Sequence, residues 1–72
     1  MMKAEYKSFL GFYYIIVCVD EEGTVLSFWN GARFGKSAHK AFKFKEYDEA
    51  LSEIETQLMN DDVAVLRMDV SR

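Results

Sequence analysis

Two apolar segments joined by a short acidic turn constrain this fold more than any other part of the chain. Residues 12–19 and residues 24–30 are rich in aromatic and β-branched side chains, which is typical of strands in a well-covered sheet. The turn between them begins with Asp20 and ends with Gly23. Asp favours the first position of a type I turn, and Gly at the fourth position takes positive φ at little steric cost. The sequence therefore predicts an antiparallel hairpin with a three-residue loop and a bulge.

The register of this hairpin follows if Asp20 faces Thr24, which also sets Ile15 opposite Trp29. One face of the hairpin then carries Tyr14, Ile16, Cys18, Leu26 and Phe28. The other face carries Tyr13, Ile15, Val17, Val19, Val25 and Trp29. Both faces are apolar, whereas an antiparallel sheet with one side open to water is polar on that side. We therefore expect something to cover each face.

The segment after the hairpin has two interpretations. Residues 31–37 are expected to form a loop, since they include two glycines and are of mixed polarity. Residues 39–45 alternate Phe42 and Phe44 with lysines, which predicts a third strand. A helix beginning near Ser37 is the alternative, because apolar residues from 44 to 58 also recur at steps of three and four. We favour the strand, since the rings of Phe42 and Phe44 would lie about 200° apart on a helix.

The rest of the chain predicts a helix and a last strand. An apolar stripe runs from Tyr47 to Leu58 with acidic residues off it, so we expect an amphipathic helix over residues 47–59, with Asn60 as a left-handed stop. Residues 63–70 are expected to form the last strand. The fold class is therefore α+β, an antiparallel-rich sheet with one helix on one face, in the order β-β-β-α-β and in one domain, residues 1–72. A right-handed crossover would place the last strand beside the first and parallel to it, giving the spatial order 4-1-2-3.

One helix covers only one face of such a sheet, and this leaves an apolar surplus. The surface expected to stay open carries Tyr13, Ile15, Val17 and Trp29, or else the opposite set of side chains, near Glu49 and Glu53 of the helix. Large exposed apolar patches mark protein contacts, and Tyr and Trp are common energetic anchors of interfaces. We therefore expect this surface to bind another protein or a second copy of the chain. The competing interpretation is that Phe9, Leu10 and Phe12 fold back over it.

The charge distribution supports a different hypothesis. No acidic residue occurs between Gly23 and Lys45, and the cations there are Arg33, Lys36, Lys40, Lys43 and Lys45. Because aromatic residues are interleaved with them, this segment is suited to contact phosphates and stack bases. The simpler interpretation is that the lysines keep an edge strand solvated. The net charge of −3 weighs against nucleic acid, and the acidic residues 46–55 are suited instead to a basic protein surface.

Residue types needed for catalysis are scarce. His39 is the single histidine and Cys18 the single cysteine, so we expect no metal site, no cofactor, no small-molecule substrate and no enzymatic activity. Residues 31–37 differ from a phosphate-binding loop, because three residues rather than four precede the Gly-Lys-Ser. Cys18 is expected to be a buried, unreactive thiol. One cysteine without a signal peptide or a long apolar segment favours a cytoplasmic location and no membrane association.

The hairpin is followed by Phe-Lys-Glu-Tyr-Asp-Glu-Ala at residues 44–50 and then by an amphipathic helix. This arrangement resembles that of small phage- and prophage-encoded proteins, the anti-CRISPR proteins among them. The resemblance implies a compact, acidic α+β inhibitor that blocks a host defence complex by occupying one of its binding surfaces. It covers the architecture over residues 13–58 and implies no particular functional residue.

Overall fold

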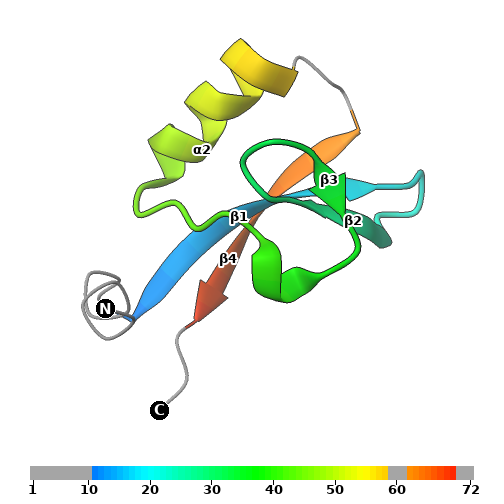
Figure 1. Ribbon diagram of the computed structural model, residues 1–72, viewed down its shortest axis with the longest axis horizontal. Helices are drawn as coiled ribbons and strands as arrows, with labels where there is room; N and C mark the ends of the chain where they lie inside the picture. The colour runs from blue at the N-terminus through cyan, green and yellow to red at the C-terminus, as the bar shows by residue number, and fades with distance from the viewer. Residues whose placement is uncertain (1–10, 59–61, 70–72) are drawn as a thin grey trace.

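The computed structural model describes residues 11–58 and 62–69. Its elements are β1 (Phe12–Val19), β2 (Val25–Trp29), β3 (Phe34–Gly35), the 3-10 turn η1 (Ala38–Lys40), α2 (Tyr47–Glu53), its π-helical continuation η2 (Ile54–Leu58) and β4 (Val63–Asp69). The strands form one sheet in the order β3-β2-β1-β4, and every neighbouring pair is antiparallel (Figure 1). The α+β class is confirmed. The expected cover by Phe9 and Leu10 and the helix stop at Asn60 lie outside the described residues.

The hairpin turn has the predicted chemistry. Gly23 adopts a φ of +86°, and its N–H donates to the carbonyl of Asp20 at 3.0 Å. The Asp20 carboxylate accepts the backbone N–H groups of Glu22 and Thr24, each at 2.9 Å. The side chain and the backbone of Asp20 therefore both hold the turn closed.

A bulge changes the register beyond the turn. Val19 pairs with Val25 as predicted, but Cys18 pairs with Ser27, so Leu26 is an extra residue in β2. A shift of one residue moves each later side chain to the opposite face of a sheet. The predicted pairing of Ile15 with Trp29 is therefore wrong. Trp29 packs with Ile16 on one face, and Phe28 joins Ile15 on the other.

The third strand lies earlier than predicted. Asn30 accepts the N–H groups of Ala32 and Arg33 through its side chain, and this tight turn sends Phe34 directly back along β2. A strand over residues 39–45 is wrong, because Ala38–Lys40 is a 3-10 turn. The alternation of phenylalanine and lysine still marks extended chain, since Phe44 forms a bridge with Tyr14. Their two backbone hydrogen bonds are each 2.8 Å long.

This extended segment explains why β4 is antiparallel to β1 rather than parallel. Phe42 N–H donates to the carbonyl of Trp29, and Phe44 runs antiparallel to Tyr14, so the segment continues the line of β2 beyond its end. The chain thus runs along the sheet once more, antiparallel to β1, before the helix begins. The helix then delivers the chain to β4 from the other end, and Ile15 pairs with Leu66 in an antiparallel register.

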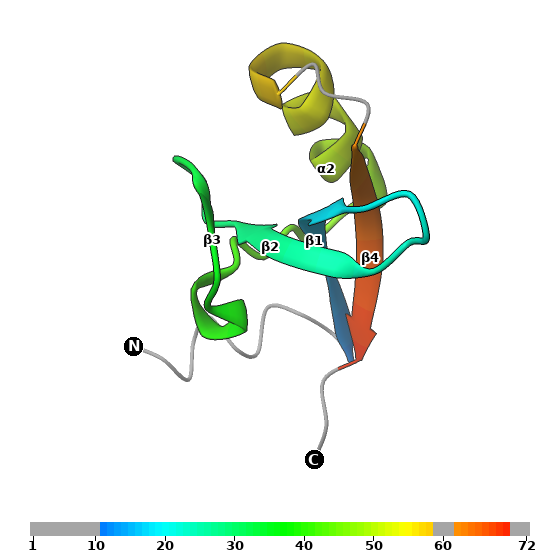
Figure 2. The ribbon, with the colours of Figure 1, turned by 90° about the vertical axis from the view of Figure 1, so that its right-hand side faces the viewer.

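Both faces of the sheet are covered. On one face α2 packs over a core of Ile16, Trp29, Phe44 and Ala50. On the other face Ala41 packs against Ile15 and Val17, and Figure 2 shows α2 and the η1 segment on opposite sides of β2. The expectation of an open face is wrong, because Ile15, Val17 and Trp29 are 3%, 0% and 7% exposed. Within the described residues, no helix is long and apolar enough to cross a bilayer.

Candidate protein-binding surface

The predicted interface residues separate into two groups. Ile15, Val17 and Trp29 are interior residues and Tyr13 is half-buried, whereas Glu49 is exposed on α2. One contact links the groups, since the Trp29 indole N–H donates to Glu53 Oε2 at 3.1 Å. Trp29 is therefore a core residue that holds the Glu53 carboxylate in place, and its buried ring is not available for a partner.

A hollow of about 530 Å³ lies beside α2, lined by Phe42, Phe44, Asp48, Glu49, Ser52 and Glu53. We call it the acidic groove. Phe42 is 47% exposed, and its ring stands at 61° to that of Phe44 with the centroids 4.8 Å apart. Gly31 lies behind Phe42, and a Cβ on Gly31 would come within 3.2 Å of the Phe42 ring. The glycine thus lets the ring sit close against the backbone.

The helix start fixes the acids of the groove. Glu46 and Glu49 form a capping box at the N-terminus of α2, and Glu49 Oε1 accepts the backbone N–H groups of Lys45 and Glu46 at 3.2 and 3.3 Å. Glu53 is held by the indole of Trp29. In residues 11–58 and 62–69 no lysine or arginine forms an ion pair with the groove acids, and Arg67 pairs with Asp69 instead. The groove therefore keeps a negative charge next to an exposed aromatic ring.

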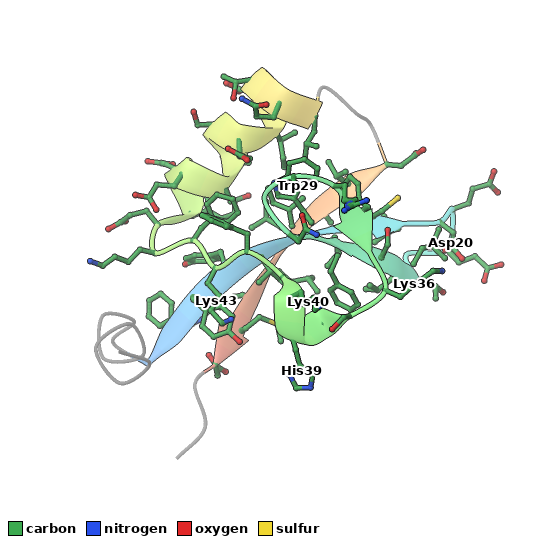
Figure 3. All side chains as sticks on the ribbon, in the orientation of Figure 1. Asp20, Trp29, Lys36, His39, Lys40 and Lys43 are labelled. Carbon is green, nitrogen blue, oxygen red and sulfur yellow. The ribbon has the colours of Figure 1, made fainter. Side chains whose placement is uncertain are left out.

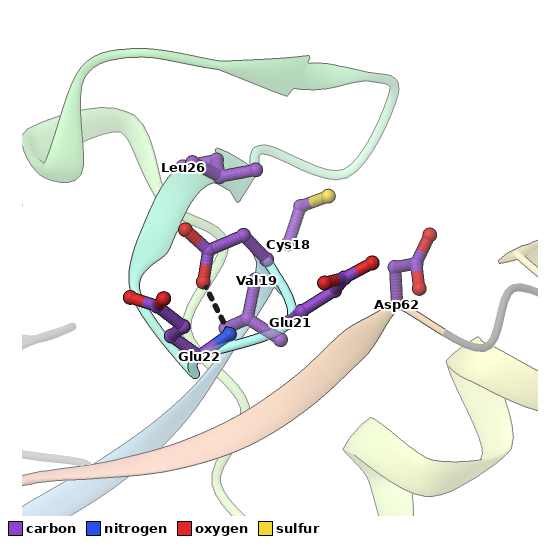
Figure 4. Close-up of a pocket in the computed structure, with 7 residues that line it drawn as sticks. Cys18, Val19, Glu21, Glu22, Leu26 and Asp62 are labelled. Carbon is purple, nitrogen blue, oxygen red and sulfur yellow. Dashed lines mark hydrogen bonds between the residues drawn. The ribbon is translucent and has the colours of Figure 1, made fainter.

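A second acidic hollow of about 640 Å³ lies at the hairpin turn (Figure 4), lined by Cys18, Val19, Asp20, Glu21, Glu22, Leu26 and Asp62. Leu26, the extra residue of the bulge, lines it and is 46% exposed. The Asp20 carboxylate there is already bonded to the turn. Cys18 is half-buried, which corrects the expectation of a fully buried thiol. This hollow offers acids but no aromatic ring.

Three of the five predicted cations lie along one segment. Figure 3 shows Lys36, Lys40 and Lys43 following the chain from the end of β3 past η1, and the Lys43 ammonium lies 5.5 Å from the ring centroid of Tyr13. Arg33 is exposed in the turn before β3. Lys45 belongs to the acidic helix start, where its N–H bonds to Glu49. The basic residues therefore occupy the β3–η1 side, and the acids occupy α2 and the hairpin turn.

Comparisons with protein-family models, curated proteins and solved structures found no match to this chain. In the part of the chain that the structure describes, no three His, Cys, Asp or Glu side chains are placed to hold a metal ion. Sequence reasoning selected Glu49 and Glu53 but missed Phe42, whose alternation with lysines was assigned to a strand. The extended segment that ends at Phe44, on the helix side of the sheet, is what brings Phe42 to these acids.

Proposed function

We propose that the protein is a non-enzymatic interaction module that binds a basic segment of another protein in the acidic groove. The observation that supports this most directly is the exposed ring of Phe42 beside Asp48, Glu49 and Glu53, in a hollow of about 530 Å³. An aromatic face and carboxylates both attract a cation. An arginine or lysine side chain of a partner is the ligand that satisfies both.

The charges of the groove favour arginine as the anchor. A guanidinium is planar, stacks on aromatic rings and donates to carboxylates in a fixed fork. A cation over an aromatic ring contributes about 0.5–1 kcal/mol at an exposed site and about 2 kcal/mol when desolvated. Glu49 and Glu53 are already held by hydrogen bonds from Lys45, Glu46 and Trp29. Little side-chain freedom remains to be lost when the partner binds.

The biological form that we propose is a phage-type, anti-CRISPR-like inhibitor that occupies a basic surface of a host defence complex. Residues 46–72 hold eight acidic and two basic residues, a net charge of −6, and such a segment is drawn to basic surfaces that otherwise bind nucleic acid. We place this activity in the cytoplasm, where the free thiol of Cys18 would stay reduced.

The groove proposal is tested by titrating the protein with a short arginine-containing peptide and following backbone amide shifts by NMR. We expect shifts centred on Phe42 and on α2, and a loss of binding of tenfold or more in Phe42→Ala. Glu21→Gln, which removes one charge at the hairpin turn, is the matched control and should bind as the wild type does. Equal affinity of Phe42→Ala and wild type would reject the groove. Failure to inhibit any defence complex despite intact peptide binding would reject only the inhibitor role.

A second candidate function is nucleic-acid binding through Arg33, Lys36, Lys40, Lys43 and Lys45. The row of Lys36, Lys40 and Lys43 along η1 favours it (Figure 3), since phosphate contacts require several cations on one surface. It predicts binding to a single-stranded oligonucleotide that weakens steeply as salt rises. Lys36→Ala combined with Lys40→Ala should abolish it. No retardation of DNA or RNA at low salt would remove this candidate.

A further inference from the structure

The strand β4 forms one end of the sheet (Figure 2). It runs from Val63 to Asp69 and pairs with β1 along its inner side. Among residues 11–58 and 62–69, no strand pairs with its outer side. The opposite end of the sheet is much shorter, because β3 contains only Phe34 and Gly35. Within the described residues, β4 is therefore the long free edge of the sheet.

The hydrogen bonds of β1 determine which backbone groups of β4 face outward. Val19 N–H donates to the carbonyl of Asp62 at 2.8 Å, so this directly opposed pair is hydrogen-bonded. In an antiparallel ladder, hydrogen-bonded pairs alternate with pairs that are not hydrogen-bonded. Tyr14, at an even position, bonds to Phe44 on the other side of β1, which agrees with this alternation. The inward groups of β4 thus belong to Ala64, Leu66 and Met68, and the outward groups belong to Val63, Val65, Arg67 and Asp69.

This edge has few of the features that protect edge strands from pairing. Protected edges are short, or they carry proline, lysine or a bulge. β4 has seven residues, the chain has no proline, and the register with β1 is unbroken. Its charged residues, Arg67 and Asp69, are both at the C-terminal end, where they pair with each other at 3.4 Å.

We propose that β4 pairs with β4 of a second copy of this chain, antiparallel, about a two-fold axis at Leu66. The outward groups then meet, with Val65 opposite Arg67 and Val63 opposite Asp69 of the other copy. Leu66 lies opposite Leu66 of the second copy, in a pair without hydrogen bonds, where side chains approach most closely. On the same face Ala64 lies opposite Met68, so a small side chain meets a large one. The same strand thus provides both halves of a matched interface, as a two-fold axis requires.

The pairing joins two four-stranded sheets into one continuous sheet. It is independent of the acidic groove, because no residue of β4 lines that groove. A contact between two strands is smaller than the roughly 800 Å² per partner of a standard interface. We therefore expect a reversible dimer whose population rises with protein concentration.

Sedimentation velocity over a concentration series, combined with hydrogen exchange at single residues, tests the pairing in the intact chain. We expect the molar mass to double with concentration, and the amides of Val63, Val65 and Arg67 to become protected over the same range. The inward amides of Ala64 and Leu66 should be protected at every concentration. A monomer at all concentrations overturns the proposal, whether or not another part of the chain protects the outward amides. A dimer with unprotected outward amides also overturns it.

A pair of substitutions at one exposed position separates backbone pairing from side-chain effects. Arg67→Pro removes an outward N–H without removing a bond to β1, and edge strands accept proline at such positions. We expect at least a tenfold weaker dimer in Arg67→Pro and no comparable loss in Arg67→Ala, since both variants lose the guanidinium from above the Phe12 ring. Equal dimerisation of the two variants would overturn the pairing.

Disulfide trapping tests the register and does not depend on the proline variant. In a Cys18→Ser background, Leu66→Cys places two cysteines opposite each other at a Cα separation of about 4.5 Å, within the range of about 4.4–6.8 Å that a disulfide requires. We expect a covalent dimer under mild oxidation. Val65→Cys is the matched control, because it faces Arg67 of the second copy and should remain monomeric. Cross-linking of Val65→Cys but not Leu66→Cys would overturn the axis at Leu66.

Discussion

The two faces of the sheet both have buried cores, but they are covered by elements of very different length. On one face α2 and η2 extend from Tyr47 to Leu58 over Ile16, Trp29 and Phe44. On the other, Ala41, which directly follows the three-residue turn η1, packs against Ile15 and Val17. The second face is ringed by half-buried hydrophobic residues, namely Tyr13, Val19, Phe28, Ala64, Leu66 and Met68.

This difference teaches that a strand with two apolar faces does not require a helix on each face. Residues Ile15, Ile16 and Val17 are equally buried, although one of them points to a helix and the others to a loop segment. The helix-covered face differs in one further respect, because the Trp29–Glu53 hydrogen bond is its polar link to the surface.

The largest effect is expected at Trp29. Trp29→Ala removes a ring that is 7% exposed and packs beside Ile16, Phe34 and Phe44, and such truncations cost about 3–5 kcal/mol. A domain of this size has little stability to lose, so we expect the variant to be largely unfolded by circular dichroism. Trp29→Phe is the control that keeps an aromatic ring and should remain folded. A folded Trp29→Ala with a normal melting temperature would contradict the helix-side core.

The opposite face should respond less strongly. Val17→Ala removes two methyl groups from a side chain that is 0% exposed, which we expect to cost about 2 kcal/mol. The measurement is the midpoint of urea unfolding at an unchanged slope. Val25→Ala, on the same hairpin but 37% exposed, is the control and should cost far less. Equal losses would mean that the η1 segment does not exclude water from Val17.

Much of this fold could be predicted because local chemistry determines it. The turn from Asp20 to Gly23, the strand of residues 12–19 and the helix beginning at Tyr47 each depend on residues within a few positions of one another. The bulge at Leu26 could not be predicted in the same way, since it depends on how β2 fits both β1 and β3. That single extra residue exchanged Trp29 and Phe28 between faces, and the packing of Ala41 against Ile15 and Val17 covers the face that was expected to stay open.

The candidate site was predictable only in part. The acids of α2 were selected because an acidic run is visible in the sequence, and Glu49 and Glu53 do line the groove. Phe42 was missed because its neighbours Phe44 and Lys43 gave the same alternation that a strand gives. The segment is extended, as a strand is, but Phe44 bridges to Tyr14 beyond the end of β2, because the turn at Asn30 forms β3 earlier in the chain.

Two glycines that flank β2 differ in the space around them, and alanine substitutions should show the difference. Gly31 has a φ of +100° and lies against Phe42, whereas Gly23 has a φ of +86° with open space around it. Alanine at Gly23 should cost about 1 kcal/mol from backbone strain, and alanine at Gly31 about 2 kcal/mol, because its methyl group also meets the ring. Thermal unfolding measures both. Equal costs would show that the Phe42 ring moves freely, and the arginine-peptide affinity of Gly31→Ala would then be unchanged.

The smallest effect on stability is expected at Glu53. Glu53→Gln keeps an oxygen that can accept the Trp29 indole N–H but removes the charge, so we expect a cost of about 0.5–1 kcal/mol. Glu53→Leu removes the acceptor and should cost more, since the indole N–H is left without a partner in a half-buried setting. Urea unfolding orders the two variants. Because the groove requires the charge and the core requires only the acceptor, Glu53→Gln should weaken arginine-peptide binding several-fold while the domain stays folded. The reverse result, normal binding with marked unfolding, would assign Glu53 to the core rather than to the groove.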